Sequence, residues 1–126
     1  MAHIGIDLVD IRAIRKSLDQ GSGAFLRHTF TPAEQQAAQK APDMAEAEYL
    51  AARFAVKEAA FKAIAHFTKA KTFDFRMIET LNEPDGYPVI TLTEPLKALM
   101  EEAGVQSLSV SISTETDYAI AIVLAE

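Results

Sequence analysis

Four charged residues near the middle of the chain have the types and spacing that phosphate and metal chemistry requires. They lie in an alanine-rich segment, 53–63, which contains neither glycine nor proline and is therefore predicted to be helical. At about 3.6 residues per turn, they border an apolar stripe in two pairs. The pairs are Arg53 with Lys57 on one side, and Glu58 with Lys62 on the other. One acid and three bases beside a buried face could hold a metal ion and an anion.

The same spacing also has an ordinary structural interpretation. Glu58 and Lys62 are four residues apart in the favourable order for a surface ion pair, which contributes a few tenths of a kcal/mol. Arg53 and Lys57 could extend their aliphatic stems along the core and keep their charges in water. Spacing alone favours this interpretation, so the chemical one depends on the rest of the chain.

Composition limits the classes of protein to which the chain can belong. Its 126 residues, 49% of them hydrophobic, suit a single domain over residues 1–126. The chain has no cysteine, so thiol chemistry is excluded and a cytoplasmic setting is expected. No run of about 18 apolar residues occurs, so we expect no membrane partner. The net charge of −6 argues against nucleic acid as a partner.

An acidic residue near the N-terminus lies on a predicted strand. Residues 3–9 alternate as a strand does, with three bulky apolar residues on one face. Asp7 lies on the opposite face near Gly5, which leaves space beside it. By itself, Asp7 could equally be a hydrogen-bonding group of the strand. A helix is predicted from about residue 10, and it carries an outward basic cluster formed by Arg12, Arg15 and Lys16.

Turn and capping residues divide the rest of the chain. Glycines in 21–23 end the first helix, and a loop follows. Thr31 and Glu34 predict a capping box at the start of a second helix, which Pro42 interrupts. The further expected elements are a long central helix to about residue 66, strands 73–81 and 87–93 joined by an Asp-Gly turn, a helix from Pro95 to Gly104, and two strands within 107–125.

The predicted order of elements is β-α-α-α-β-β-α-β-β. Strands and helices do not alternate strictly, which argues against a doubly wound parallel sheet. We therefore expect an α+β fold in which a mixed or antiparallel sheet packs around the long central helix.

Three separated segments, taken together in order, resemble one known family. The first is GIDLVDI at 5–11, and the second is FTPAE at 30–34 followed by ARFAVKEAAFKA at 52–63. The third is SVSIS at 109–113 followed by YAIA at 118–121. This order and spacing are similar to the holo-acyl-carrier-protein synthases, the short members of the 4′-phosphopantetheinyl transferase superfamily. The resemblance runs nearly end to end, and it implies that superfamily's α+β fold.

The resemblance also implies an activity. Such enzymes move the 4′-phosphopantetheine arm of coenzyme A onto a serine of an acyl carrier protein, and they release adenosine 3′,5′-bisphosphate. Mg²⁺ is the usual metal. They are typically homotrimers with each active site at a subunit interface.

The family's motifs imply roles for matching residues. Asp7 and Glu58 match the two acidic positions and would bind Mg²⁺ together with phosphate oxygens. Lys62 could meet a phosphate oxygen, and either Lys62 or Glu58 could remove the proton of the acceptor serine. Arg53 and Lys57 match basic positions and would hold phosphate or an acidic partner.

Further matching positions concern the nucleotide. Gly86 and Pro88 match a Gly-x-Pro turn near the nucleotide, although hairpin geometry alone would explain both. Ser113 and Thr114 end the Ser-Ile-Ser stretch, and their hydroxyls could hydrogen-bond phosphate.

The basic cluster of the first helix suggests a protein partner. Acyl carrier proteins are strongly acidic, so Arg12, Arg15 and Lys16 could dock one by steering and orientation. An ordinary solvated helix face is the alternative.

Three departures from the family's pattern bear on activity. Thr114 stands where relatives usually carry histidine, and 66–71 replaces a glycine-rich turn, with Lys69 and Lys71 as possible substitutes for its phosphate contacts. The run 43–48 is acidic where many relatives carry bases.

These departures leave an active but specialised transferase as the preferred interpretation. A non-catalytic relative that binds a carrier protein or assembly partner is the alternative. Retention of Asp7, Glu58 and Lys62 favours catalysis. An unrelated α+β thioester-binding domain would require the three-segment match to be coincidence.

Overall fold

The structure is a computed structural model that describes residues 2–41 and 43–126, so Pro42 lies outside the described residues. Its elements are β1 (His3–Asp10), α1 (Ile11–Asp19), α2 (Ala24–Thr29), α3 (Pro32–Lys40), α4 (Glu46–Ile64), β2 (Glu79–Asn82), β3 (Pro88–Thr91), α5 (Glu94–Ala103), β4 (Leu108–Glu115) and β5 (Tyr118–Ala125), with short 3-10 helices at Ala65–Phe67 and Phe75–Met77.

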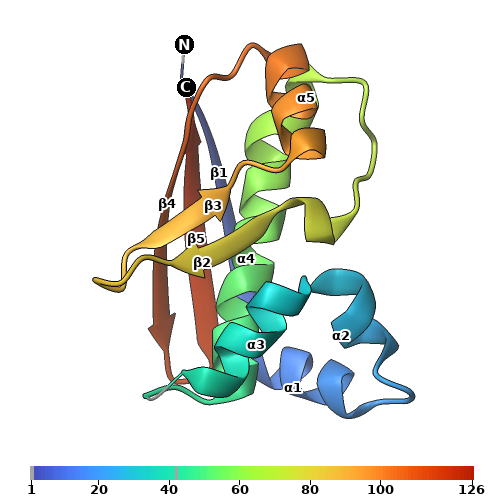
Figure 1. The fold of residues 1–126 in the computed structure, drawn as a ribbon, viewed down its shortest axis with the longest axis vertical. Coiled ribbons are helices and arrows are strands. Elements are labelled where there is room, and N and C mark those ends of the chain that lie inside the picture. The colour runs from blue at the N-terminus through green and yellow to red at the C-terminus, as the bar shows by residue number, and fades with distance from the viewer. Residues whose placement is uncertain (1, 42) are drawn as a thin grey trace.

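Two antiparallel sheets surround one long helix. Strands β1, β5 and β4 form a three-stranded sheet in that order, and β2 pairs with β3 in a separate hairpin. Helix α4 packs along the larger sheet, with α1, α2 and α3 near one end of the molecule and α5 near the other (Figure 1). This arrangement confirms the predicted α+β fold around a central helix. None of the described helices is long and apolar enough to cross a membrane.

Local sequence signals account for several helix ends. The backbone N–H of Glu34 donates to the Thr31 hydroxyl at 3.2 Å, and the Glu34 carboxylate accepts from the Thr31 N–H at 3.0 Å. This confirms the predicted capping box of α3. Helix α5 begins after Thr93 and ends at Gly104, whose φ of 72° is a left-handed value that glycine adopts without strain.

Helix α2 occupies a segment that was predicted to be a loop. Gly23 precedes it with a φ of 80°, and the helix is only six residues long. The Phe25 ring packs edge-on against that of Phe30, with 5.9 Å between ring centroids. Tertiary packing therefore stabilises a helix that is too short for intrinsic propensity to predict.

The predicted strand 73–81 is wrong in its first half. Residues Phe75–Met77 form a 3-10 turn, and β2 begins only at Glu79. The Asp74 carboxylate accepts a hydrogen bond from the backbone N–H of Arg76 at 2.9 Å. Such a local side-chain bond competes with strand pairing and explains the late start.

Helix α4 is buried on most of its surface instead of along one stripe. The sheet covers one side, while α1, α3 and β2 contact others. A helix with this environment carries many alanines, because small side chains let neighbouring elements approach closely. Basic residues on one side of α4 consequently lie inside the protein.

Strand β1 lies close to α4 because one of its residues lacks a side chain. A Cβ atom at Gly5 would overlap the carbonyl oxygen of Ala59. On the same face of the sheet, Ala119, Ala121 and Ala125 of β5 are fully buried. The close approach places the residue two positions after Gly5, Asp7, beside the helix.

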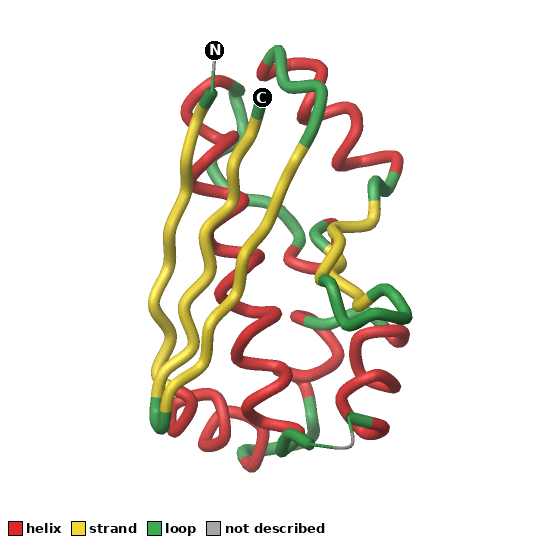
Figure 2. The backbone as a smooth tube through the Cα atoms, turned by 90° about the vertical axis from the view of Figure 1, so that its left-hand side faces the viewer, coloured by secondary structure: helices red, strands yellow, loops and turns green. Residues whose placement is uncertain are grey.

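The outer face of the three-stranded sheet is exposed, and it is apolar along β1 and β5. Ile4, Ile6 and Leu8 of β1 are 69%, 49% and 62% exposed, and Ile122 of β5 is 43% exposed. In Figure 2 the three-stranded sheet turns this face toward the viewer, and α4 lies behind the sheet. The bulky side of β1 thus faces away from the core, and the side with Gly5 and Asp7 faces inward.

Candidate active site

Asp7 and Lys62 meet where β1 packs against α4. The Lys62 ammonium donates to Asp7 Oδ1 at 3.0 Å and to the backbone oxygen of Ile6 at 3.0 Å. The Asp7 side chain is 17% exposed and that of Lys62 is 53% exposed. Lys62 therefore links the helix to the strand and places a positive charge beside the carboxylate.

Glu58 lies one helical turn before Lys62. Burial raises the pKa of the Glu58 carboxyl above its ordinary value, and the negative charge of Asp7 raises it further, while Lys62 partly offsets both effects. Asp7 and Glu58 are thus close enough to influence each other. The surface ion pair that spacing suggested between Glu58 and Lys62 is replaced by the pair between Lys62 and Asp7.

The two carboxylates suit a metal that needs few protein ligands. Within residues 2–41 and 43–126, no group of three or more histidine and acidic side chains could hold an ion. Mg²⁺ commonly takes one or two carboxylates and completes its shell with water and phosphate oxygens. Asp7 and Glu58 fit that requirement and offer no all-protein cage.

Two cavities flank Phe61 on this side of α4. Lys62 and His66 line a cavity of about 250 Å³, called here the Lys62 cavity. Glu58 lines a cavity of about 220 Å³, called the Glu58 cavity. Phe61 and Lys71 line both, so the two candidate catalytic side chains border adjacent hollows.

The prediction that Lys57 holds a phosphate is wrong for this structure. Its side chain is fully buried, and its ammonium donates to Glu34 Oε1 at 2.8 Å and to the backbone oxygens of Phe75 and Ile78 at 3.0 and 2.6 Å. All three N–H donors therefore have protein acceptors. Lys57 joins α3, α4 and the segment before β2 instead of facing a ligand.

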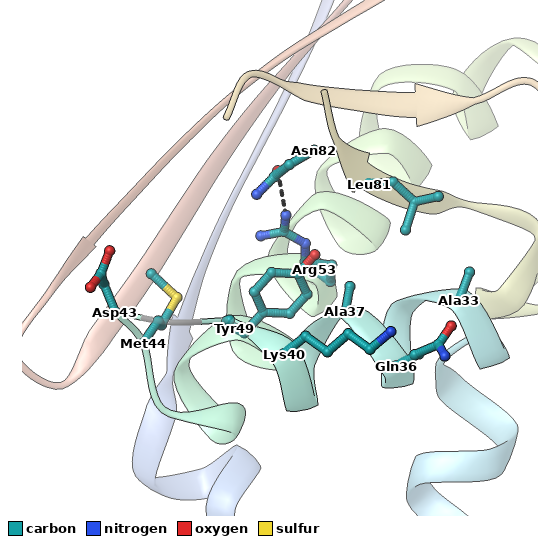
Figure 3. Close-up of a pocket in the computed structure, with 11 residues that line it drawn as sticks. Ala33, Gln36, Ala37, Lys40, Asp43, Met44, Tyr49, Arg53, Leu81 and Asn82 are labelled. Atoms are coloured by element: carbon teal, nitrogen blue, oxygen red, sulfur yellow. Dashed lines mark hydrogen bonds between the residues drawn. The ribbon is translucent and has the colours of Figure 1, made fainter. Parts of the chain in front are cut away.

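Arg53 is also buried, but it borders a cavity. Its Nη2 donates to Asn82 Oδ1 at 2.6 Å, and its guanidinium carbon lies 3.7 Å from the centre of the Tyr49 ring. Its Nε has no hydrogen-bond partner among the residues that the structure describes, and burial lowers the pKa of Arg53 from the ordinary arginine value. The cavity, of about 580 Å³, lies between α3, the start of α4 and the end of β2, and Lys40 and Met44 also line it (Figure 3).

The Gly86–Pro88 turn lies next to the Arg53 cavity. Gly86 has a φ of 91° and donates its N–H to the Glu83 oxygen at 2.7 Å, so hairpin geometry by itself accounts for this glycine. Pro88 begins β3 and pairs with Asn82, whose side chain accepts from Arg53. Asn82 thus connects the turn to the buried Arg53.

Ser113 and Thr114 lie apart from Asp7 within one chain. They belong to edge strand β4, Asp7 belongs to the other edge strand, and β5 separates them. Ser113 is exposed on the outer face of the sheet. It pairs with Ile120 of β5, which pairs on its other side with Leu8 of β1. A single chain therefore does not bring these hydroxyls to the Asp7 site.

The predicted basic cluster of α1 is divided by the structure. Arg12 donates to both carboxylate oxygens of Asp10, at 3.0 and 2.9 Å, and lies 3.5 Å from Asp117. Its hydrogen bonds hold the pKa of Asp10 below the ordinary value. Arg15 and Lys16 are exposed. All three side chains are therefore exposed, but the charge of Arg12 is largely offset within the chain.

Sequence reasoning did not assign Tyr49 and Asn82, which both contact Arg53. Tyr49 is four residues before Arg53 on α4, a spacing that brings two helix side chains together and could have been noticed. Asn82 contacts Arg53 across 29 residues of sequence, and no local pattern indicates such a contact.

Comparisons with known proteins agree with the family resemblance of the three sequence segments. The model of the 4′-phosphopantetheinyl transferase superfamily matches residues 3–123. A holo-[acyl-carrier-protein] synthase of Dehalococcoides mccartyi is 38% identical over 127 residues, and the alignment covers 100% of this chain and 99% of the relative.

Solved structures of such enzymes have the same fold. An ACPS–CoA complex from Chronobacterium ammoniagenes matches with a TM-score of 0.84 at 29% identity, covering 100% of this chain and 97% of that one. The Helicobacter pylori holo-[acyl-carrier-protein] synthase in complex with coenzyme A matches with a TM-score of 0.81 at 32% identity, covering 98% and 99%.

The chain belongs to the 4′-phosphopantetheinyl transferase superfamily. The relatives just described are holo-[acyl-carrier-protein] synthases matched along nearly their full length. The interpretation as an unrelated thioester-binding domain is therefore wrong.

Proposed function

We propose that this protein transfers the 4′-phosphopantetheine arm of coenzyme A onto a serine of an acyl carrier protein. The observation that carries the proposal is the cluster of Asp7, Lys62 and Glu58 between β1 and α4. Phosphoryl transfer mainly requires that the protein position the reactants and offset negative charge. A module that only binds a carrier protein needs no carboxylate pair beside a lysine.

The reaction breaks the phosphoanhydride bond of the coenzyme A diphosphate and forms a phosphate ester bond to serine. The serine oxygen bonds to the phosphorus of the phosphopantetheine phosphate, and the bond from this phosphorus to the bridging oxygen of the diphosphate breaks. The bridging oxygen leaves with adenosine 3′,5′-bisphosphate, and the serine proton passes to a base on the protein.

Glu58 suits the role of that base better than Lys62 does. Lys62 is already engaged as a hydrogen-bond donor to Asp7 and to a backbone oxygen, so these contacts hold it beside Asp7. The pKa of Glu58 is raised by burial, which makes its carboxylate a stronger base than an exposed one. Lys62 instead holds Asp7 in place and offers positive charge to a phosphate oxygen.

Asp7 and Glu58 would hold Mg²⁺ at this site. The bound ion would neutralise charge on the diphosphate. Burial raises the pKa of Glu58, and the negative charge of Asp7 raises it further. A cation bound between the two carboxylates would offset their repulsion.

The Arg53 cavity would take the nucleotide end of coenzyme A. An almost fully buried guanidinium with an unpartnered Nε borders a space of about 580 Å³. The Gly86–Pro88 turn is linked to it through Asn82. The planar, charged guanidinium of Arg53 suits hydrogen bonds to a phosphate group, and the neighbouring hairpin turn suits contact with the adenine ring.

Assembly into a homotrimer with interfacial sites is the arrangement we propose. The exposed Ile4, Ile6, Leu8 and Ile122 form an apolar face of the kind that marks contact with another protein chain. Ser113 lies on this same face, and Thr114 follows it on the edge strand β4, both away from Asp7 in their own chain. Contact between copies would supply Ser113 and Thr114 to a neighbour's site.

Arg15 and Lys16 would orient the acidic carrier protein. Both are exposed on α1, whereas Arg12 is paired with Asp10. Exposed charges act mainly on the rate of association and on orientation.

Calorimetry tests the binding half of the proposal. We expect coenzyme A to bind at least about tenfold more tightly with Mg²⁺ than with chelator, and Asp7→Asn to remove this dependence. Lys97→Met, which changes the charge of an exposed α5 residue, is the matched control and should bind as the wild type does. Metal-independent binding in the wild type would contradict the proposed site.

A further inference from the structure

The connection after α4 turns without using left-handed backbone. Residues 65–71 contain no glycine, and none of them has a positive φ. The turn is closed by Thr68, whose hydroxyl donates to the Ala65 oxygen at 3.1 Å and accepts from the Ala70 N–H at 3.1 Å. A threonine side chain thus replaces the conformational freedom that glycine would provide.

The backbone of this turn is not free to bind an anion. Three consecutive N–H groups already have protein acceptors: Thr68 donates to Ala65, Lys69 to the Glu102 carboxylate at 2.8 Å, and Ala70 to Thr68. Loops that bind phosphate through the backbone present such N–H groups to the ligand. A phosphate bound beside residues 68–70 would therefore be held by side chains.

One side chain of the connection is placed to do this. Lys71 lines both the Lys62 cavity and the Glu58 cavity, whereas Lys69 lines neither. Lys71 is exposed, and no salt bridge of it occurs among residues 2–41 and 43–126. By contrast, Lys62 is paired with Asp7 and Lys57 with Glu34, so Lys71 brings an uncompensated positive charge to these cavities.

We propose that Lys71 binds a phosphate oxygen of the coenzyme A diphosphate beside Glu58 and Lys62. Its side chain takes over the contact that a glycine-rich turn would make with backbone N–H groups. The inference rests on the proposed transferase function, and it adds a donor-binding residue from outside α4. A hydrogen bond between an ammonium and a phosphate oxygen is charge-assisted, so its loss is measurable as weaker donor binding.

Three variants test the assignment. Lys71→Met removes the charge, Lys71→Arg keeps it, and Lys69→Met makes the same charge change two residues away. We expect Lys71→Met to raise the KM and the calorimetric Kd for coenzyme A about tenfold, Lys71→Arg to stay within about threefold, and Lys69→Met to bind as the wild type does. Because Lys71 is exposed, all three should unfold at the wild-type temperature.

Competitive inhibitors show which part of coenzyme A contacts Lys71. Inhibition of transfer by inorganic pyrophosphate should weaken in Lys71→Met by a similar factor, while inhibition by adenosine should not change. Unchanged donor binding in Lys71→Met would overturn the proposal, and so would a rise in the carrier-protein KM alone. Failure of the wild type to transfer would instead overturn the proposed function, and calorimetry with coenzyme A would still decide the role of Lys71.

Discussion

At the level of single residues, the charged groups of α4 have two different environments. Lys57 and Arg53 lie under α3, β2 and the segment before it, and protein acceptors or an aromatic ring satisfy most of their polar atoms. Glu58 and Lys62 border cavities between α4 and the segment that follows it. The same helix therefore contributes a stabilising ion pair on one side and the reactive groups on the other.

Loss of the Lys57 charge should destabilise the fold. Lys57→Met leaves the fully buried Glu34 carboxylate without its cation, and breaking a buried pair in this way costs about 3 to 5 kcal/mol. Urea unfolding measures the change. Adding Glu34→Gln to Lys57→Met should recover part of the loss, because no uncompensated charge remains. A Lys57→Met protein as stable as the wild type would contradict a structural role.

Transfer should depend on the ionisation of Glu58. Its pKa is raised by burial and by Asp7, so kcat/KM should begin to fall on acidification at a higher pH than the ordinary glutamate value of about 4.3 predicts. The activity is lost as pH falls, because the carboxylate is the active form. Rate profiles at low and high Mg²⁺ measure the shift, and more Mg²⁺ should move the fall to lower pH.

Glu58→Gln provides the control for that profile. It should lose at least about 100-fold in kcat at every pH, since the base is absent. A raised pKa in the folded state means that ionised Glu58 lowers stability at neutral pH, so the metal-free variant should unfold at or slightly above the wild-type temperature. Lower stability of this variant would contradict the assigned environment.

Residue types and spacing located part of the site. Glu58 and Lys62 were recognisable as neighbours on one helix, but Asp7 meets Lys62 across 55 residues of sequence, and only the family resemblance joined them. The burial of Lys57 was missed because the packing of α3 and β2, and not the helical pattern, decides which side of α4 reaches solvent.

At the level of elements, the approach of β1 to α4 forms the site. Gly5→Ala would place a Cβ atom on the carbonyl oxygen of Ala59, and neither backbone can move without disturbing the sheet. We expect a loss of about 3 kcal/mol in the free energy of unfolding, together with weaker Mg²⁺-dependent coenzyme A binding, because Asp7 moves from Lys62. Ser111→Ala, at an exposed position of β4, should change stability by less than about 0.5 kcal/mol. A fully stable Gly5→Ala protein would contradict this packing.

Elements with strong local signals could be predicted, and those that depend on packing could not. Residues close together in the sequence determine the capping box of α3, the hairpin turn and the alternation of β1, β4 and β5. Helix α2 depends on Phe25 reaching Phe30, and the 3-10 turn at Phe75–Met77 depends on the Asp74 side chain. The alternation of residue types in β1 also predicted that Asp7 lies on the face opposite Ile4, Ile6 and Leu8. It did not show which of the two faces is buried.

At the level of the whole molecule, the exposed sheet face is the feature that a single chain does not explain. Ile122→Glu, in the middle strand of that face, should convert the proposed trimer into single chains, because a charge would be buried at the proposed interface. Light scattering after size-exclusion chromatography measures the mass. Transfer should fall at least about tenfold with the loss of assembly, since sites shared between chains lose their positioning.

An exposed apolar residue elsewhere controls for added charge. Leu92 is an exposed residue directly after β3 and is not part of the three-stranded sheet. Leu92→Glu should change neither the mass of the particle nor its activity. A wild-type protein that is a monomer at all concentrations would contradict the trimer, and a monomeric Ile122→Glu protein with full activity would contradict interfacial sites.

Intact-mass spectrometry of a carrier protein tests the central claim most directly. Apo-acyl carrier protein is incubated with the wild type, coenzyme A and Mg²⁺, in parallel with Glu58→Ala and with chelator. The account predicts a mass gain of one phosphopantetheine with the wild type and none in the two other reactions. No gain with any of several carrier proteins, or an equal gain with Glu58→Ala, would contradict it.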